Sequence, residues 1–299
     1  MAEKKEKSLP SISQLLEESW RLFEKTSLTY LKLFGLSVVA VLLAVLIGVL
    51  FAFPLSFVTF GSHSVDLNHL TLFPITMIIL LMVWFILFIL LFIAIAVITP
   101  IVGVFILQEK KGSLFQLIKQ SKQFFWQYFL AALLSGVVTF GGIILFFIPG
   151  LLFAVFFTFV LYEVVMEQQS GSTALKKSYF LVKNNFWEVI VRLFVLEIGL
   201  IIISVILNRL AGGNWLLNLV RFLFSIFSMW YSRAYVYLLY KQLREHTTLS
   251  SHISFRWIWI LSSIGWVLLI FFASMLIFNA SHLQGMMRMH SHRIHRIRY

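Results

Sequence analysis

The sequence predicts an all-α, polytopic transmembrane helix bundle, and three observations carry this prediction. Hydrophobic residues make up 60% of the 299 positions and charged residues only 12%, whereas a soluble domain has about 25% charged residues. The apolar residues form runs long enough to cross a bilayer, which needs about 20 residues per helix. Lysine and arginine gather in alternate connections between these runs, the pattern of cytosolic loops.

The first ten residues, MAEKKEKSLP, carry charges of both signs, and the first apolar run begins only near Leu31. A signal peptide would place its short apolar region much earlier. We therefore interpret residues 1–10 as a retained cytosolic tail.

Seven apolar runs are candidate membrane spans, because each has few or no charges and none alternates like a barrel strand. They are residues 33–53, 74–97, 129–147, 151–166, 189–207, 216–239 and 257–278. The third and fourth runs flank Pro149-Gly150, where proline should end a helix and glycine should permit the turn.

The loop charges orient these spans. The basic residues lie before the first span and between the second and third, the fourth and fifth, and the sixth and seventh, while the alternate connections have only Arg209. This places the N-terminus in the cytosol of a cell whose membrane holds the protein.

The six-span core is residues 11–245; residues 246–279 add a loop and the seventh span, and residues 280–299 are a basic tail rich in histidine and arginine. Seven spans would leave that tail outside the cell. We favour a true seventh span for its length and lack of charge, and a re-entrant or interfacial segment is the alternative.

Residues 172–187, STALKKSYFLVKNNFW, are a polar and basic island before the fifth span. On a helix with Ser172 as its N-cap, one face gathers by the i, i+3, i+4, i+7 rule. That face consists of Leu175, Ser178, Tyr179, Val182 and Phe186.

The other side of this helix carries Lys176, Lys177 and Lys183. We expect an amphipathic helix along the inner leaflet, with these lysines near anionic headgroups. Trp187 marks the depth where the chain enters the bilayer, because an indole prefers the interface.

The arrangement recurs before the first and third spans. Residues 11–23 and 113–126 align with residues 170–182 when Ser19, Ser121 and Ser178 are superimposed. Either the chain repeats one unit three times, a surface helix followed by a helical hairpin, or any amphipathic helix before a span produces this likeness.

One stretch resembles a known family. Residues 148–190 contain a Pro-Gly turn, an acidic span end, a glycine, Ala-Leu, a serine and Asn-Phe-Trp, and residues 235–245 end the sixth span with tyrosine, leucine and arginine. The motif residues are Pro149-Gly150, Glu167, Gly171, Ala174-Leu175, Ser178, Asn185-Phe186-Trp187, Tyr240, Leu243 and Arg244. This pattern is similar to the glycerophosphoryl diester phosphodiesterase membrane-domain family and its multi-pass bacterial relatives.

The resemblance covers about residues 11–245, including SWRLF near the N-terminus. Glu163, at a position where the family pattern has proline or an apolar residue, departs from it, and so do the seventh span and basic tail. Enzymes of the family carry a soluble catalytic barrel that this sequence does not contain. The resemblance therefore implies a membrane domain and not the hydrolase activity.

Charged residues inside spans are functional candidates, because a charge near the bilayer centre is costly unless it is paired or wetted. Glu188 and Arg192 form an i, i+4 pair. Glu197 is the deepest, with Arg221 or Arg233 as counter-ions, and Glu163 is positioned to pair with Arg233. The candidate intramembrane polar site is Glu163, Arg192, Glu197, Arg221 and Arg233.

Small residues recur every four positions on two spans, which lets helix backbones approach closely in lipid. They are Ala40, Ala44, Gly48 and Ala52 on the first span, and Ala132 and Gly136 on the third. This pattern favours a compact bundle or an oligomer.

Function is left open by the sequence. The net charge of +12 lies beside apolar runs, which indicates anionic phospholipid headgroups and not nucleic acid. We find no catalytic motif and expect no cofactor or metal. We favour a non-enzymatic envelope scaffold or a membrane subunit that binds lipid, a protein partner or a second copy; a transporter or channel that uses Glu197 is the alternative.

Overall fold

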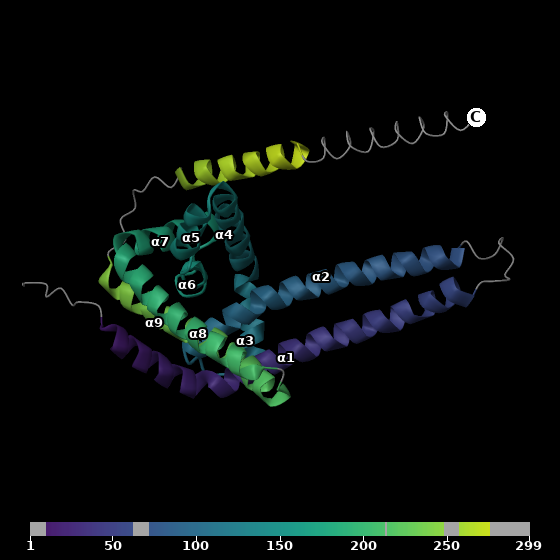
Figure 1. Ribbon diagram of the computed structural model, residues 1–299, viewed down its shortest axis with the longest axis horizontal. Coiled ribbons are helices and arrows are strands. Elements are labelled where there is room, and N and C mark those ends of the chain that lie inside the picture. The colour runs from purple at the N-terminus through teal and green to yellow at the C-terminus, as the bar shows by residue number, and fades with distance from the viewer. Residues whose placement is uncertain (1–9, 62–71, 213, 248–256, 276–299) are drawn as a thin grey trace, which may run out of the picture.

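The computed structural model describes residues 10–61, 72–212, 214–247 and 257–275 (Figure 1). These ranges contain helices and no strand, which confirms the all-α class. The helices are α1 (Ile12–Gly61), α2 (Leu72–Leu107), α3 (Leu114–Ser121), the 3₁₀ turn η1 (Lys122–Phe124), α4 (Phe125–Leu145), α5 (Phe147–Phe156), α6 (Val160–Val165), α7 (Gly171–Asn184), α8 (Phe186–Ala211), α9 (Trp215–His246) and the unlabelled helix Trp257–Met275.

Six helical segments of the described chain are long and apolar enough to cross a membrane. They are Ile12–Leu50, Ile79–Leu107, Leu114–Leu145, Phe147–Val165, Phe186–Ala211 and Trp257–Met275. Helix α9, which contains the predicted sixth span, is not among them, because polar side chains such as Asn218, Arg221 and Arg233 interrupt its apolar surface. The polytopic bundle is confirmed, and a count of seven spans is not.

The predicted surface helix at the N-terminus and the first span are one continuous helix of 50 residues. The separate surface helix was wrong because no glycine or proline occurs between Ile12 and Phe34 to end it. The first part of α1 lies across α9, where Tyr231 Oη donates to the Leu16 carbonyl at 3.1 Å. Beyond it, α1 and α2 extend side by side away from the other helices (Figure 1).

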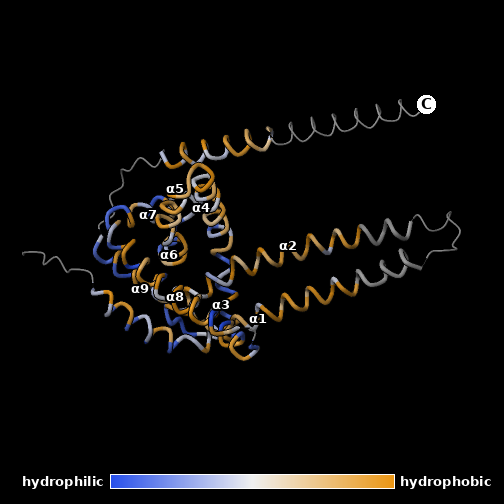
Figure 2. Tube along the Cα trace, viewed as in Figure 1, coloured by the Kyte–Doolittle hydropathy of each residue, from blue (hydrophilic) through white to orange (hydrophobic). Residues whose placement is uncertain are grey.

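The basic connectors meet at one end of the bundle. Lys25 of α1 forms an ion pair with Glu109 after α2, and Gln242 Nε2 near the end of α9 donates to Glu18 Oε2 at 3.3 Å. We call this region, which also includes α3 and α7, the basic end; hydrophilic residues gather there in Figure 2. Two predicted membrane spans separate each basic connector from the next, so the chain returns to the same end of the bundle before each of them.

The turn between the third and fourth predicted spans lies earlier than Pro149-Gly150. Helix α4 ends at Leu145, Phe146 is extended, and Pro149 lies in the first turn of α5. Proline starts a helix here because a first-turn residue needs no backbone N–H. Gly150 instead permits close packing, since a Cβ there would lie 2.2 Å from Ile143 Cγ1.

Helix α7 has the predicted apolar face, but that face contacts protein and not lipid. Leu175, Ser178, Tyr179 and Val182 are all buried, and α7 packs against α4, α5 and α6. It therefore covers the basic end of the bundle, because the other helices leave an apolar surface there. Its N-cap is Ser170, two residues before the predicted Ser172.

The three serines that align the repeat share one environment. Ser19, Ser121 and Ser178 are each fully buried. Ser19 Oγ donates to the Leu15 carbonyl at 2.6 Å and Ser121 Oγ to the Ile118 carbonyl at 2.7 Å. Ser178 Oγ donates to the Phe156 carbonyl at 2.7 Å, a bond between helices. Burial is common to the three positions, but two of the bonds close within one helix and the third joins two helices, so the three-fold repeat stays a prediction.

The helix Trp257–Met275 docks on α4 through two glycines. A Cβ on Gly265 would lie 1.9 Å from the Gly141 carbonyl oxygen. Beside this contact, Trp266 Nε1 donates to the Val137 carbonyl at 3.1 Å. The helix after the six-span core is therefore part of the bundle, and residues 276–278 of the predicted span lie outside the described ranges.

Candidate functional site

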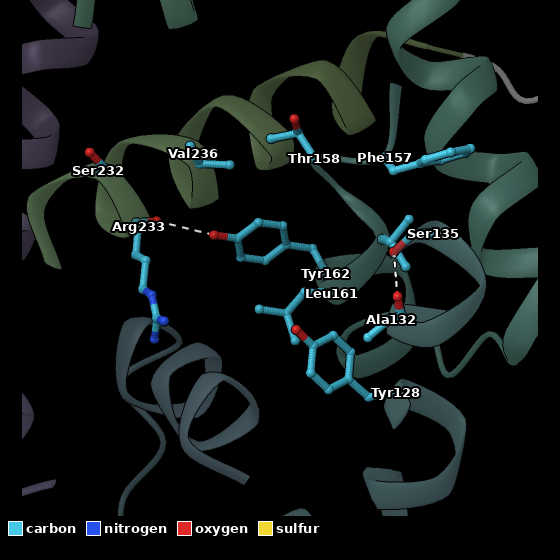
Figure 3. A pocket seen from close by; sticks show the side chains of 11 residues that line it. Tyr128, Ala132, Ser135, Phe157, Thr158, Leu161, Tyr162, Ser232, Arg233 and Val236 are labelled. Carbon is cyan, nitrogen blue, oxygen red and sulfur yellow. Dashed lines mark hydrogen bonds between the residues drawn. The ribbon is translucent and has the colours of Figure 1, made fainter. Parts of the chain in front are cut away.

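A pocket of about 280 Å³ lies between α4, the α5–α6 junction and α9 (Figure 3). Tyr128 in the first turn of α4 places it near the basic end. Its polar lining consists of Tyr128, Ser135, Thr158, Tyr162, Ser232 and Arg233. The remaining wall is apolar, with Leu161 and Val236 facing the same space.

Most hydroxyl protons in the pocket are already used. Tyr162 Oη donates to the Arg233 carbonyl at 3.1 Å (Figure 3). Ser135 Oγ donates to the Ala132 carbonyl at 2.9 Å, and Thr158 Oγ1 to the Ala154 carbonyl at 3.0 Å. These oxygens can accept further hydrogen bonds, but their protons are engaged.

Three groups keep their donors free, and one of them is the Ser232 hydroxyl, which makes no hydrogen bond within the described residues. Within the described part of the chain, the Arg233 guanidinium has no carboxylate within 4 Å and no hydrogen bond, and neither has Tyr128 Oη. The Arg233 guanidinium is close enough for its charge to interact with the phenol groups of Tyr30, Tyr128 and Tyr162. A partly buried cation without a counter-ion is costly, so a ligand that brings negative charge would be stabilised there.

A rigid aromatic framework holds α9 in place around this pocket. Trp230 stacks on Tyr30 with ring centroids 5.7 Å apart, and Tyr162 stacks on Tyr240 at 5.3 Å. Tyr30 Oη also donates to the Gly103 carbonyl of α2 at 2.8 Å. Buried phenols need such partners. Tyrosines inside otherwise apolar runs are therefore the sequence signal for this framework, and the predicted polar site, built from charges alone, did not include them.

Glu163 pairs with Arg244 and not with Arg233 as predicted. Its carboxylate is fully buried, accepts from Tyr240 Oη at 3.2 Å and lies 4.0 Å from Arg244 Nη1. Arg244 Nη2 donates to Glu167 Oε2 at 3.0 Å. Arg233 is not the partner, because Tyr240 and Arg244 lie about two and three helical turns further along α9.

Arg244 stays charged in this network. Burial alone would lower its pKa, but the hydrogen bond to Glu167 and the charges of Glu163 and Glu167 together raise the pKa above its ordinary value. Glu163 Oε2 is buried and has no hydrogen-bond partner among the residues that the structure describes. The motif residues Glu167, Tyr240 and Arg244 thus meet around Glu163, and Leu243 is a buried core residue of the same helix, α9.

The Glu188–Arg192 pair is confirmed, with Arg192 Nη1 3.5 Å from Glu188 Oε2. Arg192 also donates to the Pro10 carbonyl at 3.1 Å, tying the start of the described chain to α8.

Glu197 has neither of its predicted counter-ions. It is exposed on α8 and does not line the pocket that contains Arg233. Arg221 donates instead to Asn208 Oδ1 at 2.6 Å. The predicted pairing is wrong, because Glu197 is exposed on α8 whereas Arg233 lines the pocket between α4 and α9.

The small residues of the first span do pack. Trp84 of α2 lies over Gly48, where a Cβ would be 2.0 Å from the indole, and Trp84 Nε1 donates to the Ala44 carbonyl at 3.2 Å. Ala40 is partly buried on the same face. The Ala52 side chain lies outside the described ones.

The small residues of the third span do not pack as predicted. Gly136 is exposed with nothing within 4 Å of an added Cβ, and Ala132 lines the pocket. The close contacts of α4 come from Gly141 and Gly142 instead, since they face the last helix and α5. Spacing alone did not distinguish these two glycine faces.

The residues predicted to contact the inner leaflet lie on or near the surface of the protein. Lys176 and Lys183 are exposed on α7, Lys177 is partly buried, and the Trp187 side chain is 74% exposed at the start of α8. No group of three histidine, aspartate or glutamate side chains comes together in the described ranges.

No protein-family model matches this chain, and neither the curated proteins nor the solved structures include a match to it.

Proposed function

We propose that this protein is a non-enzymatic integral membrane protein that binds an anionic lipid, with the lipid headgroup at Arg233 and Tyr128. The observation that carries the proposal is the free guanidinium of Arg233 inside a partly apolar pocket. The resemblance to a membrane-domain family agrees with such a role and adds no activity to it.

The chemistry of the pocket suits a phosphate or carboxylate group. A guanidinium offers a planar fork of donors that can bind two oxygens at once, and the Tyr128 phenol adds a further donor. At about 280 Å³ the cavity fits a headgroup and not a whole lipid. The acyl chains would then run along α4, where exposed Gly136 leaves space beside the pocket.

Exposed lysines support the proposal at longer range. Lys119 and Lys122 at α3, and Lys176 and Lys183 on α7, surround the basic end. Each lysine near an anionic leaflet contributes about 1 kcal/mol of attraction. Anionic lipids would therefore be concentrated beside the pocket.

The transport alternative depended on Glu197 lining a path. Glu197 lies outside the pocket, so it adds no support for that alternative.

To test this, the protein is reconstituted in nanodiscs that contain phosphatidylglycerol and phosphatidylcholine and is then purified from them. The amount of each lipid that stays bound to the protein is measured. We expect Arg233→Gln to lower the retained phosphatidylglycerol about tenfold, because a charge-assisted hydrogen bond contributes about 1.5–3 kcal/mol. Arg221→Gln is the matched control on the same helix and should retain the wild-type amount. Equal retention by wild type and Arg233→Gln would refute the proposal.

A further inference from the structure

Three polar side chains lie on the exposed side of α8, inside a segment apolar enough to cross a membrane. Glu197, Ser204 and Asn208 are all exposed. Their separations of seven and four residues place them on one face, because each residue turns an α-helix by about 100°. Phe194 and Ile201 complete this face and are 62% and 56% exposed.

These five positions form a seam with the spacing of a coiled coil. The steps between residues 194, 197, 201, 204 and 208 alternate between three and four, which averages about 3.5 residues and keeps one face turned to a partner helix. Within the chain the seam has one side-chain bond, from Arg221 to Asn208, and the buried face of α8 is a different one that includes Val189 and Leu196.

Polar side chains that face lipid are stabilised when a second helix supplies hydrogen-bond partners for them. An isolated carboxylate facing acyl chains is costly, and serine and asparagine side chains in membranes hydrogen-bond across helices. Within the described ranges, no side chain pairs with Glu197 or Ser204.

We propose that the partner is the α8 helix of a second copy of this chain, in a parallel two-fold dimer. A two-fold axis along the membrane normal places every seam residue beside its own equivalent. Asparagine and serine each carry a donor and an acceptor, and two facing carboxyl groups can share one proton. All three polar residues are therefore complementary to themselves, whereas a helix with one basic residue would satisfy only Glu197.

The C-terminal part of the seam, Ser204 and Asn208, offers polar groups for this contact. It borders a groove of about 450 Å³ between α8 and α9, lined by Ser204, Asn208 and Arg221. Arg221 donates to Asn208 Oδ1 at 2.6 Å, which leaves the Asn208 amide protons free for the partner copy. The dimer goes beyond lipid binding and does not depend on the Arg233 pocket.

The first test uses the absence of cysteine from the sequence. Single cysteines are introduced at the seam, as Ile201→Cys and Ser204→Cys, and one position later, as Ile202→Cys and Val205→Cys. The purified variants are oxidised in liposomes, and cross-linked dimer is measured on gels. We expect the seam positions to cross-link at least about fivefold more than their neighbours; equal or reversed yields would overturn the seam.

The second test measures the dimer fraction by single-molecule photobleaching in liposomes. Glu197→Gln keeps a donor and an acceptor and should dimerise like wild type, whereas Glu197→Leu should weaken association about three- to tenfold. Moving the carboxyl to a neighbouring face, in the double variant Glu197→Leu with Ile198→Glu, should not restore it.

Two outcomes of this measurement contradict the proposal. In the first, the wild-type protein stays monomeric, and an added polyleucine helix with one central arginine binds it at Glu197. The partner would then be a basic helix and not a second copy. In the second, Glu197→Leu dimerises like wild type. Phosphatidylglycerol retention is measured on the same samples, so that a misfolded variant and a failed dimer are told apart.

Discussion

Replacing Gly265 with alanine should separate the last helix from α4. The added Cβ would lie 1.9 Å from the Gly141 carbonyl oxygen and 2.8 Å from its carbon. Ordinary contact of a Cβ begins at 3.4 Å, so the two backbones must move apart by roughly 1.5 Å, and neither backbone can rotate away as a side chain can. Overpacking of this kind costs about 1–3 kcal/mol.

The separation also breaks side-chain bonds across the contact. Trp266 Nε1 and Ser262 Oγ both donate to the Val137 carbonyl, at 3.1 and 3.4 Å, and interhelical bonds in membranes average about 0.6 kcal/mol. The total expected loss is therefore about 2–4 kcal/mol in the free energy of docking this helix.

The assay is fluorescence energy transfer between a donor on α4 and an acceptor on the last helix, followed through a denaturing-detergent titration. We expect a lower midpoint for Gly265→Ala. Gly136→Ala, also a glycine-to-alanine change in this bundle but with nothing within 4 Å, should keep the wild-type midpoint. The same midpoint for both variants would refute the argument from backbone contact.

Contacts elsewhere in the bundle support three further predictions. Arg244→Met should lower the free energy of unfolding by about 3 kcal/mol, because it removes the cation paired with buried Glu163. The measurement is denaturation by detergent, with Lys241→Met as the control on the same helix. Equal midpoints for the two variants would count against the ion-pair role. Ser178→Ala should cost about 1–3 kcal/mol, because it leaves the Phe156 carbonyl and Phe159 N–H without their bonds, whereas exposed Ser172→Ala should cost little in the same titration. Trp84→Phe should loosen the α1–α2 hairpin by about 0.6 kcal/mol through loss of its bond to Ala44, seen as faster amide exchange in α1; unchanged exchange there would contradict it.

The apolar runs predicted where most helices lie because lipid requires each spanning segment to satisfy its own backbone. The loop charges likewise predicted which connectors meet, as the Lys25–Glu109 pair shows. Helix boundaries were less predictable. Pro149 fits equally well as a helix stop or as a first-turn residue, and only the extended Phe146 distinguishes the two.

Charge pairing could not be predicted from depth alone. Glu163 and Arg233 were matched because both lie near one end of their helices, but the direction of a side chain around a helix depends on which neighbours it packs against. The same limit applied to Glu197, whose exposed position follows from the face of α8 that contacts α9. The Arg233 pocket combines three segments that are distant in sequence, so no local pattern indicated it.

The Glu163 network has a consequence for the order of assembly during synthesis. Tyr240, which binds the Glu163 carboxylate, is made 77 residues later. At a ribosome speed of about 5–20 residues per second, the delay is roughly 4–15 s. Until α9 emerges, the Glu163 carboxylate lacks its bond to Tyr240 and its pair with Arg244, and Lys177 of α7 is a cation already made that acts on it. The region around Glu163 therefore closes only after α9 is made, and a chain that stalls before residue 240 would leave this carboxylate without Tyr240 and Arg244.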